Sequence, residues 1–346
     1  MLETECTKCL ALSTKTGITF DEEGICNVCR EFESKRDIDW ASRKNDLLEL
    51  CDKYRGGGQY DCLVPFSGGK DSTYQLWYVV NELKMKPLVV SFDHGFFRKK
   101  HLENRERTLK KLGCDFVTVR ANYKVVKEII PISIKECGEF CWHCHTGVYG
   151  AMTQMAVRYG IPLVFWGQAT AEYGTYGSHG DIEEIDKKQY DDRFTLGVSV
   201  DKMLELLPDW ITEQDMSTFR YPEVMGLKSV RLGSFIPWDL DYISDLIKKE
   251  LGWEGNEVEG VAPKFWYEKV ECKYQPIRDY LIYKQKGFGR TRHLCSIAIR
   301  EGKMDKDEAR KLIDQYDGKI PKVLQEFESE FGIQLDNYLT NSIQCV

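Results

Sequence analysis

Short apolar runs alternate with longer amphipathic stretches from Cys62 onward, and this alternation constrains the fold more than any other feature of the sequence. The apolar runs have the length and composition of buried strands and cover residues 62–66, 88–92, 116–119 and 163–166. Helical periodicity fills the stretches between and after them, over residues 72–83, 102–112, 125–134 and 148–159. Strands that alternate with helices along the chain usually pair with one another in parallel. The sequence therefore predicts an α/β fold with a doubly wound, mostly parallel sheet covered on both faces.

The rest of the chain adds a module before and after the predicted α/β domain. We predict a cysteine-rich metal-binding module over residues 1–35, the α/β domain over 36–238 and a mainly helical C-terminal region over 239–346. An amphipathic helix over 37–54 precedes the first strand, and a last strand is predicted over 230–236. Further helices are predicted over 305–316 and 321–331.

Composition and charge exclude several classes of protein. No apolar run approaches the roughly 20 residues that span a bilayer, and the opening MLETECTKC lacks the layout of a signal peptide. Thirteen cysteines in such a chain indicate metal or redox chemistry rather than a disulfide framework. The net charge of -7 makes nucleic acid an unexpected partner, because proteins that bind polyphosphates are usually basic. We therefore expect a soluble, cytoplasmic globular protein.

The strongest chemical signal is the sequence SGGKDS at residues 67–72, directly after the first predicted strand. Gly68 and Gly69 let backbone amides turn toward a bound anion because they carry no Cβ. The predicted helix that follows adds free N–H groups and the positive end of its dipole. The segment is therefore interpreted as a phosphate-binding loop, although the G-x4-GK[ST] spacing of a Walker A loop is absent.

The side chains of this loop fit the same interpretation. Ser67 and Ser72 supply hydroxyl donors, and Lys70 supplies a positive charge. Asp71 would be repelled by a bare phosphate, so we expect it to bind a Mg²⁺ ion that the nucleotide carries.

The cysteines provide the second signal. Two C-x2-C pairs are separated by sixteen residues and comprise Cys6, Cys9, Cys26 and Cys29. Each pair can bind one metal ion through two thiolates, and the spacer returns the chain for the second pair. Four sulfur ligands with no open position predict a structural, tetrahedral Zn²⁺ site. The metal would stabilise a segment that has too few apolar residues to fold alone.

A second group of cysteines lies in CGEFCWHC, between the third and fourth predicted strands. Its C-x3-C-x2-C spacing, formed by Cys137, Cys141 and Cys144, matches the radical SAM signature, which we reject because the surrounding nucleotide fold is unrelated. A second metal site at Cys141 and Cys144, a substrate site and a plain structural role all remain open.

SGGKDS in this setting resembles the PP-loop of the ATP pyrophosphatase superfamily. Members of that superfamily adenylate a carbonyl or carboxylate oxygen, release pyrophosphate, and let a nitrogen or sulfur nucleophile displace AMP. The resemblance implies that residues 67–72 hold the pyrophosphate end of ATP, with Lys70 and Asp71 as the catalytic residues.

The same resemblance directs attention to the ends of the other strands, where ligands bind in open α/β sheets. Phe92 and Asp93 end the second strand in SFDHG and are expected to contact adenosine. Gly167 and Gln168 end the fourth strand, where a glycine allows the α-phosphate to approach the backbone.

The order of the motifs along nearly the whole chain resembles the N-acetyl sugar amidotransferase family. The motifs are the paired CxxC module, FSGGKDS, SFDHG, CWHCHTG, FWGQATAEYG and GFGRTRHLCSIAIREGKMDKDEA. Members of that family act in bacterial surface-polysaccharide and flagellin-glycan pathways, where they convert an acetamido group on a sugar into an acetamidino group. The resemblance implies that ATP adenylates the amide oxygen and that ammonia then displaces AMP.

The resemblance also implies partners. Ammonia is mostly ammonium at neutral pH, and the family obtains it from a glutaminase subunit together with a cyclase-like partner. This chain has no recognisable glutaminase nucleophile of its own, so we expect both partners to act in trans. The expected substrate is an N-acetyl sugar, carried as a sugar nucleotide or on a lipid.

Two segments are candidates for binding that sugar. Residues 168–195 are interpreted as a long loop over the site, and they contain the hydrogen-bonding residues Glu172, Tyr173, Tyr176, His179 and Asp181. The segment GFGRTRH gathers Arg290, Arg292 and His293, which fit either a diphosphate or the ATP phosphates. The alternatives are a solvated loop for the first segment and a salt-bridged surface turn for the second.

Two rival functions remain. A PP-loop sulfurtransferase, acting on tRNA or a small molecule, would hold an iron–sulfur cluster at Cys141 and Cys144, but such enzymes need a third cysteine near the end of the domain. Residues 219–238 contain none, and Cys272 and Cys295 come later, in other contexts. The other rival is a non-catalytic nucleotide-binding module that scaffolds a complex.

Overall fold

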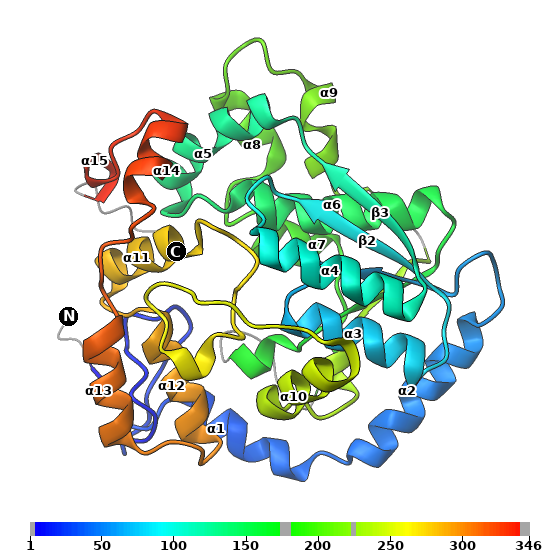
Figure 1. Ribbon diagram of the computed structural model, residues 1–346, viewed down its shortest axis with the longest axis horizontal. Coiled ribbons are helices and arrows are strands. Elements are labelled where there is room, and N and C mark those ends of the chain that lie inside the picture. The colour runs from blue at the N-terminus through cyan, green and yellow to red at the C-terminus, as the bar shows by residue number, and fades with distance from the viewer. Residues whose placement is uncertain (1–3, 174–180, 223–225, 340–346) are drawn as a thin grey trace.

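The computed structural model describes residues 4–173, 181–222 and 226–339 and contains one central sheet (Figure 1). Its five strands are all parallel and lie in the order β3-β2-β1-β4-β5. They span Cys62–Pro65 (β1), Pro87–Asp93 (β2), Asp115–Arg120 (β3), Leu163–Trp166 (β4) and Lys228–Arg231 (β5). The predicted doubly wound α/β fold is confirmed.

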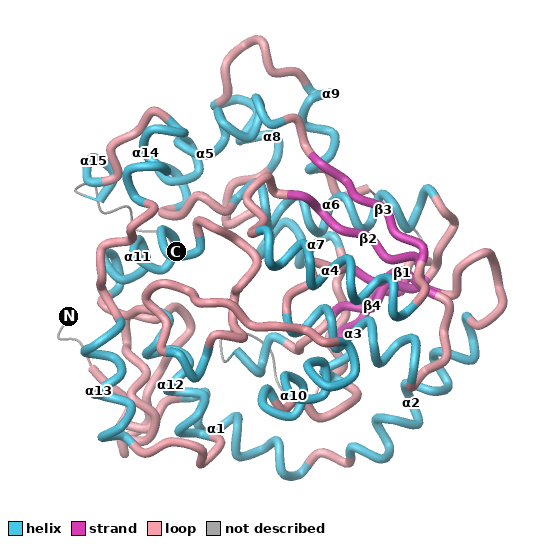
Figure 2. Tube along the Cα trace, viewed as in Figure 1, coloured by secondary structure: helices cyan, strands magenta, loops and turns pink. Residues whose placement is uncertain are grey.

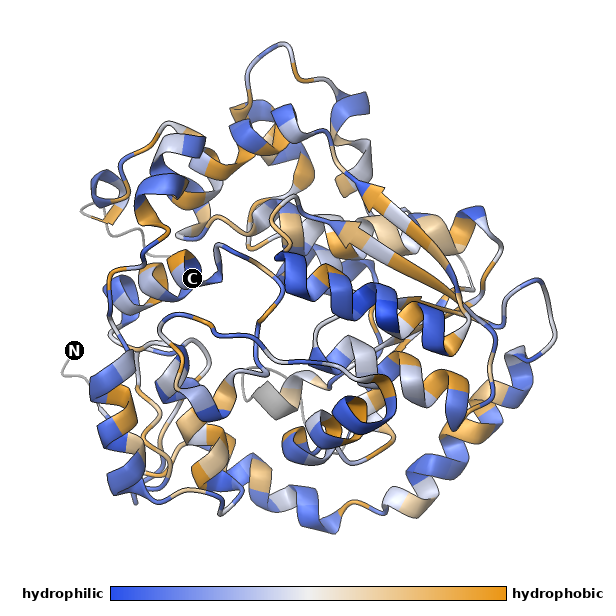
Figure 3. Cartoon of the chain, in the orientation of Figure 1, coloured by the Kyte–Doolittle hydropathy of each residue, from blue (hydrophilic) through white to orange (hydrophobic). Residues whose placement is uncertain are grey.

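Alternate side chains of the strands enter two different cores. Val64 of β1 and Phe165 of β4 belong to one cluster of buried residues, whereas their neighbours Leu63 and Val164 belong to the other. This period of two places apolar side chains on both faces of the sheet, and helices cover both. Figure 2 shows the strands as a fan between the helices, and Figure 3 shows that β2 and β3 are mainly hydrophobic whereas α4 is mainly hydrophilic.

The helices of the first face follow β1 and β2 and return from the C-terminal region. They are α3 (Lys70–Asn81), α4 (Lys99–Leu112) and α10 (Leu240–Leu251), and α10 packs against both α3 and α4. On the other face lie α5 (Tyr123–Cys137) and α6 (Trp142–Arg158), and α6 contacts β1, β2 and β4. The first face therefore combines residues from the middle and the end of the chain in one core.

The order of the strands reverses beside β1. The connection from β1 leads to β2 on one side, whereas β4 lies on the other side of β1. In open α/β sheets such a switch point leaves a crevice at the carboxyl ends of the strands, where ligands bind. Residues 67–72 lie at this point and form the turn after β1 and the first residues of α3.

The N-terminal segment packs onto the C-terminal helices. It leads through α1 (Asn27–Ser34), a 3-10 turn (Lys35–Asp37) and α2 (Trp40–Tyr54) to the sheet. Glu5 pairs with Arg292 and Arg310, and the Lys306 ammonium donates to the Thr7 carbonyl at 2.9 Å. Figure 1 shows the first residues beside α12 and α13. The C-terminal helices are α11 (Gln275–Lys286), α12 (Arg290–Arg300), α13 (Lys306–Tyr316), α14 (Leu324–Phe331) and α15 (Asp336–Leu339).

The structure corrects the end of the sheet. The last strand stops at Arg231 rather than continuing to residue 236, and Leu232–Ser234 forms a 3-10 turn. A Cβ at Gly233 would lie 2.7 Å from the backbone nitrogen of Ala169, so the chain turns where it meets the segment after β4.

The predicted loop over 168–195 and the residues after it contain short helical turns. They are η2 (Thr170–Tyr173), α7 (Lys187–Gln189), η3 (Tyr190–Phe194), α8 (Val200–Leu206), α9 (Glu213–Met216) and η4 (Ser217–Phe219), with η6 (Pro263–Phe265) later in the chain. Within the described ranges, no helix is both long enough and apolar enough to cross a membrane.

Candidate active site

Hydroxyl groups of the segment 67–72 stabilise the turn between β1 and α3 by accepting hydrogen bonds from its amides. The Gly68 amide donates to Ser72 Oγ at 3.1 Å, and the Gly69 amide donates to Ser67 Oγ at 3.2 Å. Gly68 has a φ of +93°, and a Cβ there would also lie 3.1 Å from Arg105. Glycine is therefore required at this position by both conformation and space. The loop delivers the N-terminus of α3 to the crevice, as anion binding requires.

Three ring N–H groups fix the loop from outside. His101 on α4 donates to the Ser67 carbonyl, and the Trp253 indole donates to the Gly68 carbonyl at 3.0 Å. The Trp238 indole donates to Asp71 Oδ1 at 3.1 Å and so orients that carboxylate. The loop is thus positioned by residues from α4 and from the segments on either side of α10.

Lys70 is buried and has two carboxylate partners. Its Nζ lies 2.7 Å from Asp71 Oδ1 and 2.8 Å from Glu268 Oε1, and its side chain is 1% exposed. Burial by itself lowers the pKa of Lys70, but the two carboxylates outweigh it and raise the pKa above its usual value. Burial also opposes ionisation of Asp71, yet Lys70 brings the pKa of Asp71 below its usual value. Lys70 and Asp71 are therefore both charged, and Glu268 is a partner of Lys70 that sequence reasoning missed.

A cavity of about 350 Å³ opens onto this loop at the carboxyl ends of the strands. Sequence reasoning placed eight of its lining residues in the nucleotide site: Ser67, Gly69, Lys70, Asp71, Ser72, Phe92, Gly167 and Gln168. Gly68 and Asp93 do not line it. The Asp93 carboxylate instead pairs with Arg120 and accepts from the Gly95 amide at 2.8 Å.

Arg231 is a further residue of this wall that sequence reasoning missed. It ends β5, and its guanidinium donates to the Gln168 carbonyl at 3.1 Å and to the Tyr149 hydroxyl at 3.2 Å. Its Nε lies 3.0 Å from Glu183. Arg231 thereby places a cation beside the turn at Gly167 and Gln168.

A segment of the C-terminal region, Tyr267 to Cys272, closes the cavity above the loop. It lies against the chain that follows β2, since the Arg98 amide donates to the Glu271 carbonyl at 2.9 Å and the Lys273 amide donates to the Phe96 carbonyl at 2.9 Å. A Cβ on Gly69 would lie 3.3 Å from the Glu271 carboxylate. Burial opposes ionisation of Glu271, but Lys269 and His101 lower its pKa below the usual value. We call this segment the roof segment.

The roof segment overturns one sequence-based expectation. Cys272 was assigned to a context separate from the central cysteines, but it lines the same cavity as Cys141 and Cys144. Cys141 is the N-cap of α6, and Cys144 lies in its first turn. Cys137, at the end of α5, does not line the cavity. Spacing could not predict this convergence, because it brings together residues far apart in the chain.

The basic cluster of GFGRTRH is not brought to this cavity. Arg290 pairs with Asp279 at 2.8 Å, and Arg292 pairs with Glu5 at 2.7 Å. His293 is half-buried and accepts from the Lys15 ammonium at 3.2 Å. These partners occupy the groups that were expected to hold phosphate. Of the other predicted substrate residues, the side chains of Glu172 and Tyr173, and residues Tyr176 and His179, lie outside the described part of the chain.

The N-terminal cysteines form a compact group of four buried sulfur atoms. All four sulfurs lie within 4.8 Å of one another, with 3.9 Å between Cys6 and Cys29 and 3.7 Å between Cys9 and Cys26. Tetrahedral zinc, with Zn–S bonds of about 2.3 Å, places its sulfur ligands about 3.8 Å apart. The donor set and its spacing therefore fit a closed metal site.

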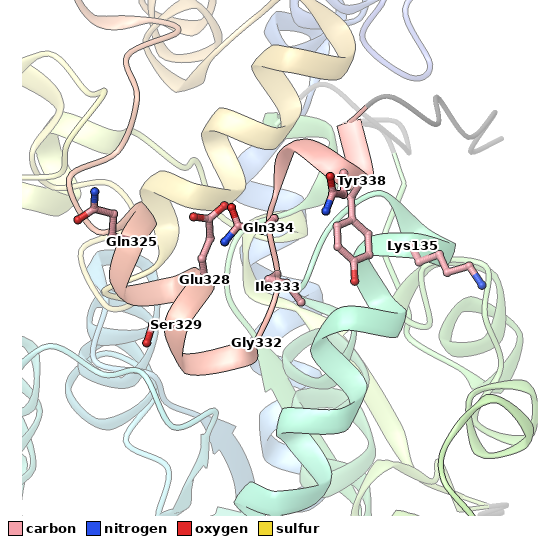
Figure 4. Close-up of a pocket in the computed structure, with 9 residues that line it drawn as sticks. Lys135, Gln325, Glu328, Ser329, Gly332, Ile333, Gln334 and Tyr338 are labelled. Atoms are coloured by element: carbon pink, nitrogen blue, oxygen red, sulfur yellow. The ribbon is translucent and has the colours of Figure 1, made fainter.

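A wider hollow of about 650 Å³ lies among the C-terminal helices, away from the phosphate loop (Figure 4). Its walls come from α5, α14 and the chain that leads to α15, and they include Lys135, Gln325, Glu328 and Tyr338. Glu328 Oε1 accepts from the Leu335 amide at 2.7 Å. No phosphate loop or thiol lines this hollow among the described residues.

Comparisons with known proteins support part of this interpretation. Residues 259–341 match the family model described as LPS biosynthesis protein WbpG-like, C-terminal domain. The matched segment includes the roof segment. The chain is also 26% identical over 335 residues to the uncharacterized protein MJ1599 of Methanocaldococcus jannaschii, covering 96% of this chain and 100% of that protein.

Two solved structures share a general similarity with the chain. The U34-tRNA thiolase NcsA from Methanococcus maripaludis, solved with its [4Fe-4S] cluster, aligns with a TM-score of 0.37 and 13% identity over 92% of this chain and 90% of that one. The NMN synthetase from Francisella tularensis aligns with a TM-score of 0.30 and 11% identity over 64% of this chain and 99% of that one.

Proposed function

We propose that this protein is an ATP-dependent N-acetyl sugar amidotransferase of the PP-loop superfamily that acts in bacterial surface-glycan biosynthesis. The observation that carries the ATP-dependent chemistry is the loop at residues 67–72, which lies at the switch point of the sheet and opens onto a cavity walled by Lys70, Asp71 and the roof segment. The match of residues 259–341 to a lipopolysaccharide-biosynthesis domain supports the pathway.

The cavity residues suggest how ATP would be bound. The N-terminus of α3 would hold the pyrophosphate end, because the Gly68 and Gly69 amides already donate to hydroxyl groups of the loop. The turn at Gly167 would leave room for the α-phosphate. Lys70 is already balanced by Asp71 and Glu268, so these three residues together carry a net negative charge. A triphosphate is therefore best accommodated with Mg²⁺, for which Asp71 and Glu271 offer oxygen ligands. The N-terminal thiols would hold Zn²⁺.

The chemistry follows from the weak reactivity of an amide. Attack of the amide oxygen on the α-phosphorus of ATP breaks the bond to pyrophosphate and makes that oxygen part of a good leaving group. Ammonia then bonds to the carbon, AMP departs with the oxygen, and the new nitrogen loses a proton to give the acetamidino group. The protein contributes alignment and neutralises the charge that develops on the phosphates.

Ammonia supply remains part of the proposal. A glutaminase subunit and a cyclase-like partner would deliver ammonia, because the free base is scarce at neutral pH. With these partners present, glutamine should replace ammonium salts as the nitrogen source, and without them it should not.

The direct test measures AMP and pyrophosphate release with ATP, ammonium and a panel of acetamido sugar nucleotides. The proposed function predicts release that requires both an acetamido sugar and ammonium, and that is lost in Lys70→Met. If the chain binds ATP but releases no pyrophosphate with any acetamido compound of the panel, the proposed function is contradicted.

One observation favours a second candidate, sulfur transfer. Cys272 supplies, next to Cys141 and Cys144, the third cysteine that such enzymes require. The same assay with sulfide in place of ammonium, followed by mass spectrometry of the product, distinguishes the two nucleophiles. Specific retention of tRNA would favour the nucleic-acid branch of this candidate, and it should weaken with salt.

A further inference from the structure

We infer that Glu268 and Glu271, the two carboxylates of the roof segment, determine which anions the loop at residues 67–72 accepts. They exclude free phosphate and pyrophosphate and admit a nucleotide only together with a divalent cation. The inference rests on the proposed function for the identity of the nucleotide. It goes beyond that function because it assigns the selectivity to two residues that lie outside the loop.

Glu268 compensates the cation of the loop. Its Oε1 lies 2.8 Å from Lys70 Nζ, which is also 2.7 Å from Asp71 Oδ1. The Lys70 and Glu268 side chains are only 1% and 2% exposed, so salt and water screen this pair weakly. A lysine in the open attracts any anion, whereas Lys70 can bind a phosphate only in competition with two carboxylates.

Glu271 compensates the other attractive feature of the loop, which is the N-terminus of α3. Gly69 is the N-cap of that helix, and a Cβ placed on Gly69 would lie 3.3 Å from Glu271 Oε2 and 3.7 Å from its Cδ. The positive end of a helix dipole favours an anion at this point, and here the protein supplies a carboxylate of its own. Burial opposes ionisation of Glu271, but nearby cations bring its pKa below the usual value, so the carboxylate is charged at neutral pH.

Both carboxylates belong to a segment that is fixed to the chain after β2. The Glu271 carbonyl accepts from the Arg98 amide at 2.9 Å, and the Arg98 guanidinium donates to the Cys272 carbonyl at 3.2 Å. The Lys273 amide, one residue beyond the segment, donates to the Phe96 carbonyl at 2.9 Å. The two glutamates are therefore part of the cavity wall, and any ligand of the loop meets them.

The wall beside the loop carries more negative than positive charge. Two lysines and three carboxylates line it: Lys70, Lys269, Asp71, Glu268 and Glu271. Each of the two arginines of the cavity has a carboxylate of its own, since Arg231 pairs with Glu183 at 3.0 Å and Arg278 pairs with Glu139 at 2.6 Å. The histidines of the cavity are uncharged at neutral pH, because burial lowers their pKa values. A free anion is therefore repelled from this wall.

A divalent cation reverses the effect of the same carboxylates. Mg²⁺ prefers oxygen ligands and is usually held by one or two carboxylates together with the phosphates of a substrate. A nucleotide that carries Mg²⁺ therefore brings the counter-charge that the roof segment requires, whereas free phosphate and pyrophosphate do not. The consequence is that free phosphate does not compete with the nucleotide for the loop.

Binding measurements on the full chain test this selectivity without any turnover. Pyrophosphate and ATP would each be titrated calorimetrically with Mg²⁺ and in a buffer without divalent cations, at constant ionic strength, and the ratio of the two dissociation constants would be compared. Glu271→Gln and Glu268→Gln each remove one charge and keep the size of the side chain. Glu326→Gln is the matched control, because Glu326 pairs with Lys273 at 2.8 Å beside the roof segment but does not line the cavity.

We expect the native chain and Glu326→Gln to bind pyrophosphate at least about 100-fold more weakly without Mg²⁺ than with it. Glu271→Gln and Glu268→Gln should each lower this ratio about tenfold by strengthening metal-free binding, since one repelling charge is lost. If Glu268→Gln does not fold, Glu271→Gln decides the question, because it leaves both ion pairs of Lys70 intact.

Two results would overturn the inference while Mg²⁺–ATP binding leaves the proposed function standing. The first is a native chain that binds pyrophosphate equally well with and without Mg²⁺. The second is a ratio that stays at the native value in Glu271→Gln. A native chain that binds neither ATP nor pyrophosphate in the presence of Mg²⁺ contradicts the proposed function and this inference with it.

Discussion

The two groups of cysteines in this molecule differ in how they are built. The N-terminal group is local, since four buried thiols from one short segment lie within 4.8 Å of one another. The cavity group is assembled across the fold, because Cys272 joins Cys141 and Cys144 from a distant segment. The first is buried, whereas the second opens onto the cavity at the carboxyl ends of the strands.

We propose that this difference separates a stabilising metal site from thiols that can contact a substrate. A metal with four protein ligands has no position left for chemistry and contributes folding free energy. A site with fewer protein ligands, beside a phosphate loop, can contact a substrate. Local spacing in the sequence was enough to recognise the closed site, while the open one required knowledge of the tertiary fold.

The largest expected effect comes from breaking the closed site with Cys26→Ser. Metal binding contributes roughly 10–16 kcal/mol to the folding of small Cys-rich modules, so the segment around residues 4–26 should unfold. Metal analysis should show the loss of one zinc per chain, and limited proteolysis should cut this segment first. Cys114→Ser, at a half-buried thiol outside both groups, is the control and should keep its zinc. Retention of zinc by Cys26→Ser would show that the four thiols do not act together.

The second effect concerns Lys70, which joins the phosphate-binding loop that we propose to the roof segment through its pairs with Asp71 and Glu268. Lys70→Met should lower pyrophosphate release about 10²–10³-fold, as expected for loss of one charge-stabilising group. It should also destabilise the fold by about 3–5 kcal/mol, because Asp71 and Glu268 lose their buried cation.

Stability and chemistry can be separated by a second substitution. Lys70→Met combined with Glu268→Gln removes a buried negative charge as well, so most of the stability should return while pyrophosphate release stays low. Urea unfolding and the release assay measure the two effects, and Lys110→Met on the exposed side of α4 is the control. Full recovery of activity in the double variant would exclude Lys70 from phosphate binding.

The predictable parts of this structure are those that local patterns specify. Short apolar runs identified the positions of the strands, and SGGKDS marked the turn after β1 and the start of α3, since glycines, hydroxyls and a helix start must be adjacent in sequence. Of the five strands β5 was misplaced, since it covers Lys228–Arg231 rather than 230–236, and its stop lies where Gly233 meets the distant Ala169.

The parts that were missed depend on long-range contacts. Glu268, Glu271 and Cys272 lie in a stretch with no periodicity, and only a concentration of acidic residues beside a cysteine marked it. Conversely, Arg290 and Arg292 formed a conspicuous basic cluster, but their partners Asp279 and Glu5 could not be recognised from spacing. A charged residue acquires a role from the groups that the fold places beside it.

The third effect is a loss of stability in acid, which comes from a histidine of the cavity and not from the closed site. Burial lowers the pKa of His94 to about 4, although Glu271 and Asp93 oppose the shift. Between pH 6.5 and about 4 the unfolded chain therefore binds a proton at His94 that the folded chain does not. The free energy of unfolding should fall in this window by about 1.4 kcal/mol per pH unit from this residue.

Urea unfolding at pH 7 and at pH 5 tests whether the free energy of unfolding falls in acid as expected. His94→Asn, whose amide oxygen can still accept from the Phe96 amide as His94 Nδ1 does at 3.1 Å, should show a shallower acid loss than the native chain. Zinc content should be the same in both chains at pH 7. An unchanged acid slope in His94→Asn would mean that the other buried histidines dominate, among them His101, whose pKa burial also lowers.

The smallest effect tests whether the closed site supports the open one. Glu5 precedes the first zinc-site cysteine and pairs with Arg292 at 2.7 Å and with Arg310 at 2.6 Å, on the two helices that follow the roof segment and α11. Because these groups are partly exposed, Glu5→Gln should cost only about 1 kcal/mol of stability. A double-mutant cycle of Glu5→Gln and Arg292→Gln, read by urea unfolding, should give a coupling of about 0.5–1 kcal/mol. If the N-terminal module contributes nothing to the rest of the fold, the cycle gives no coupling. If the module stabilises the region that carries the roof segment, the coupling is measurable, and removing the zinc should also weaken ATP binding in the cavity that the roof segment lines.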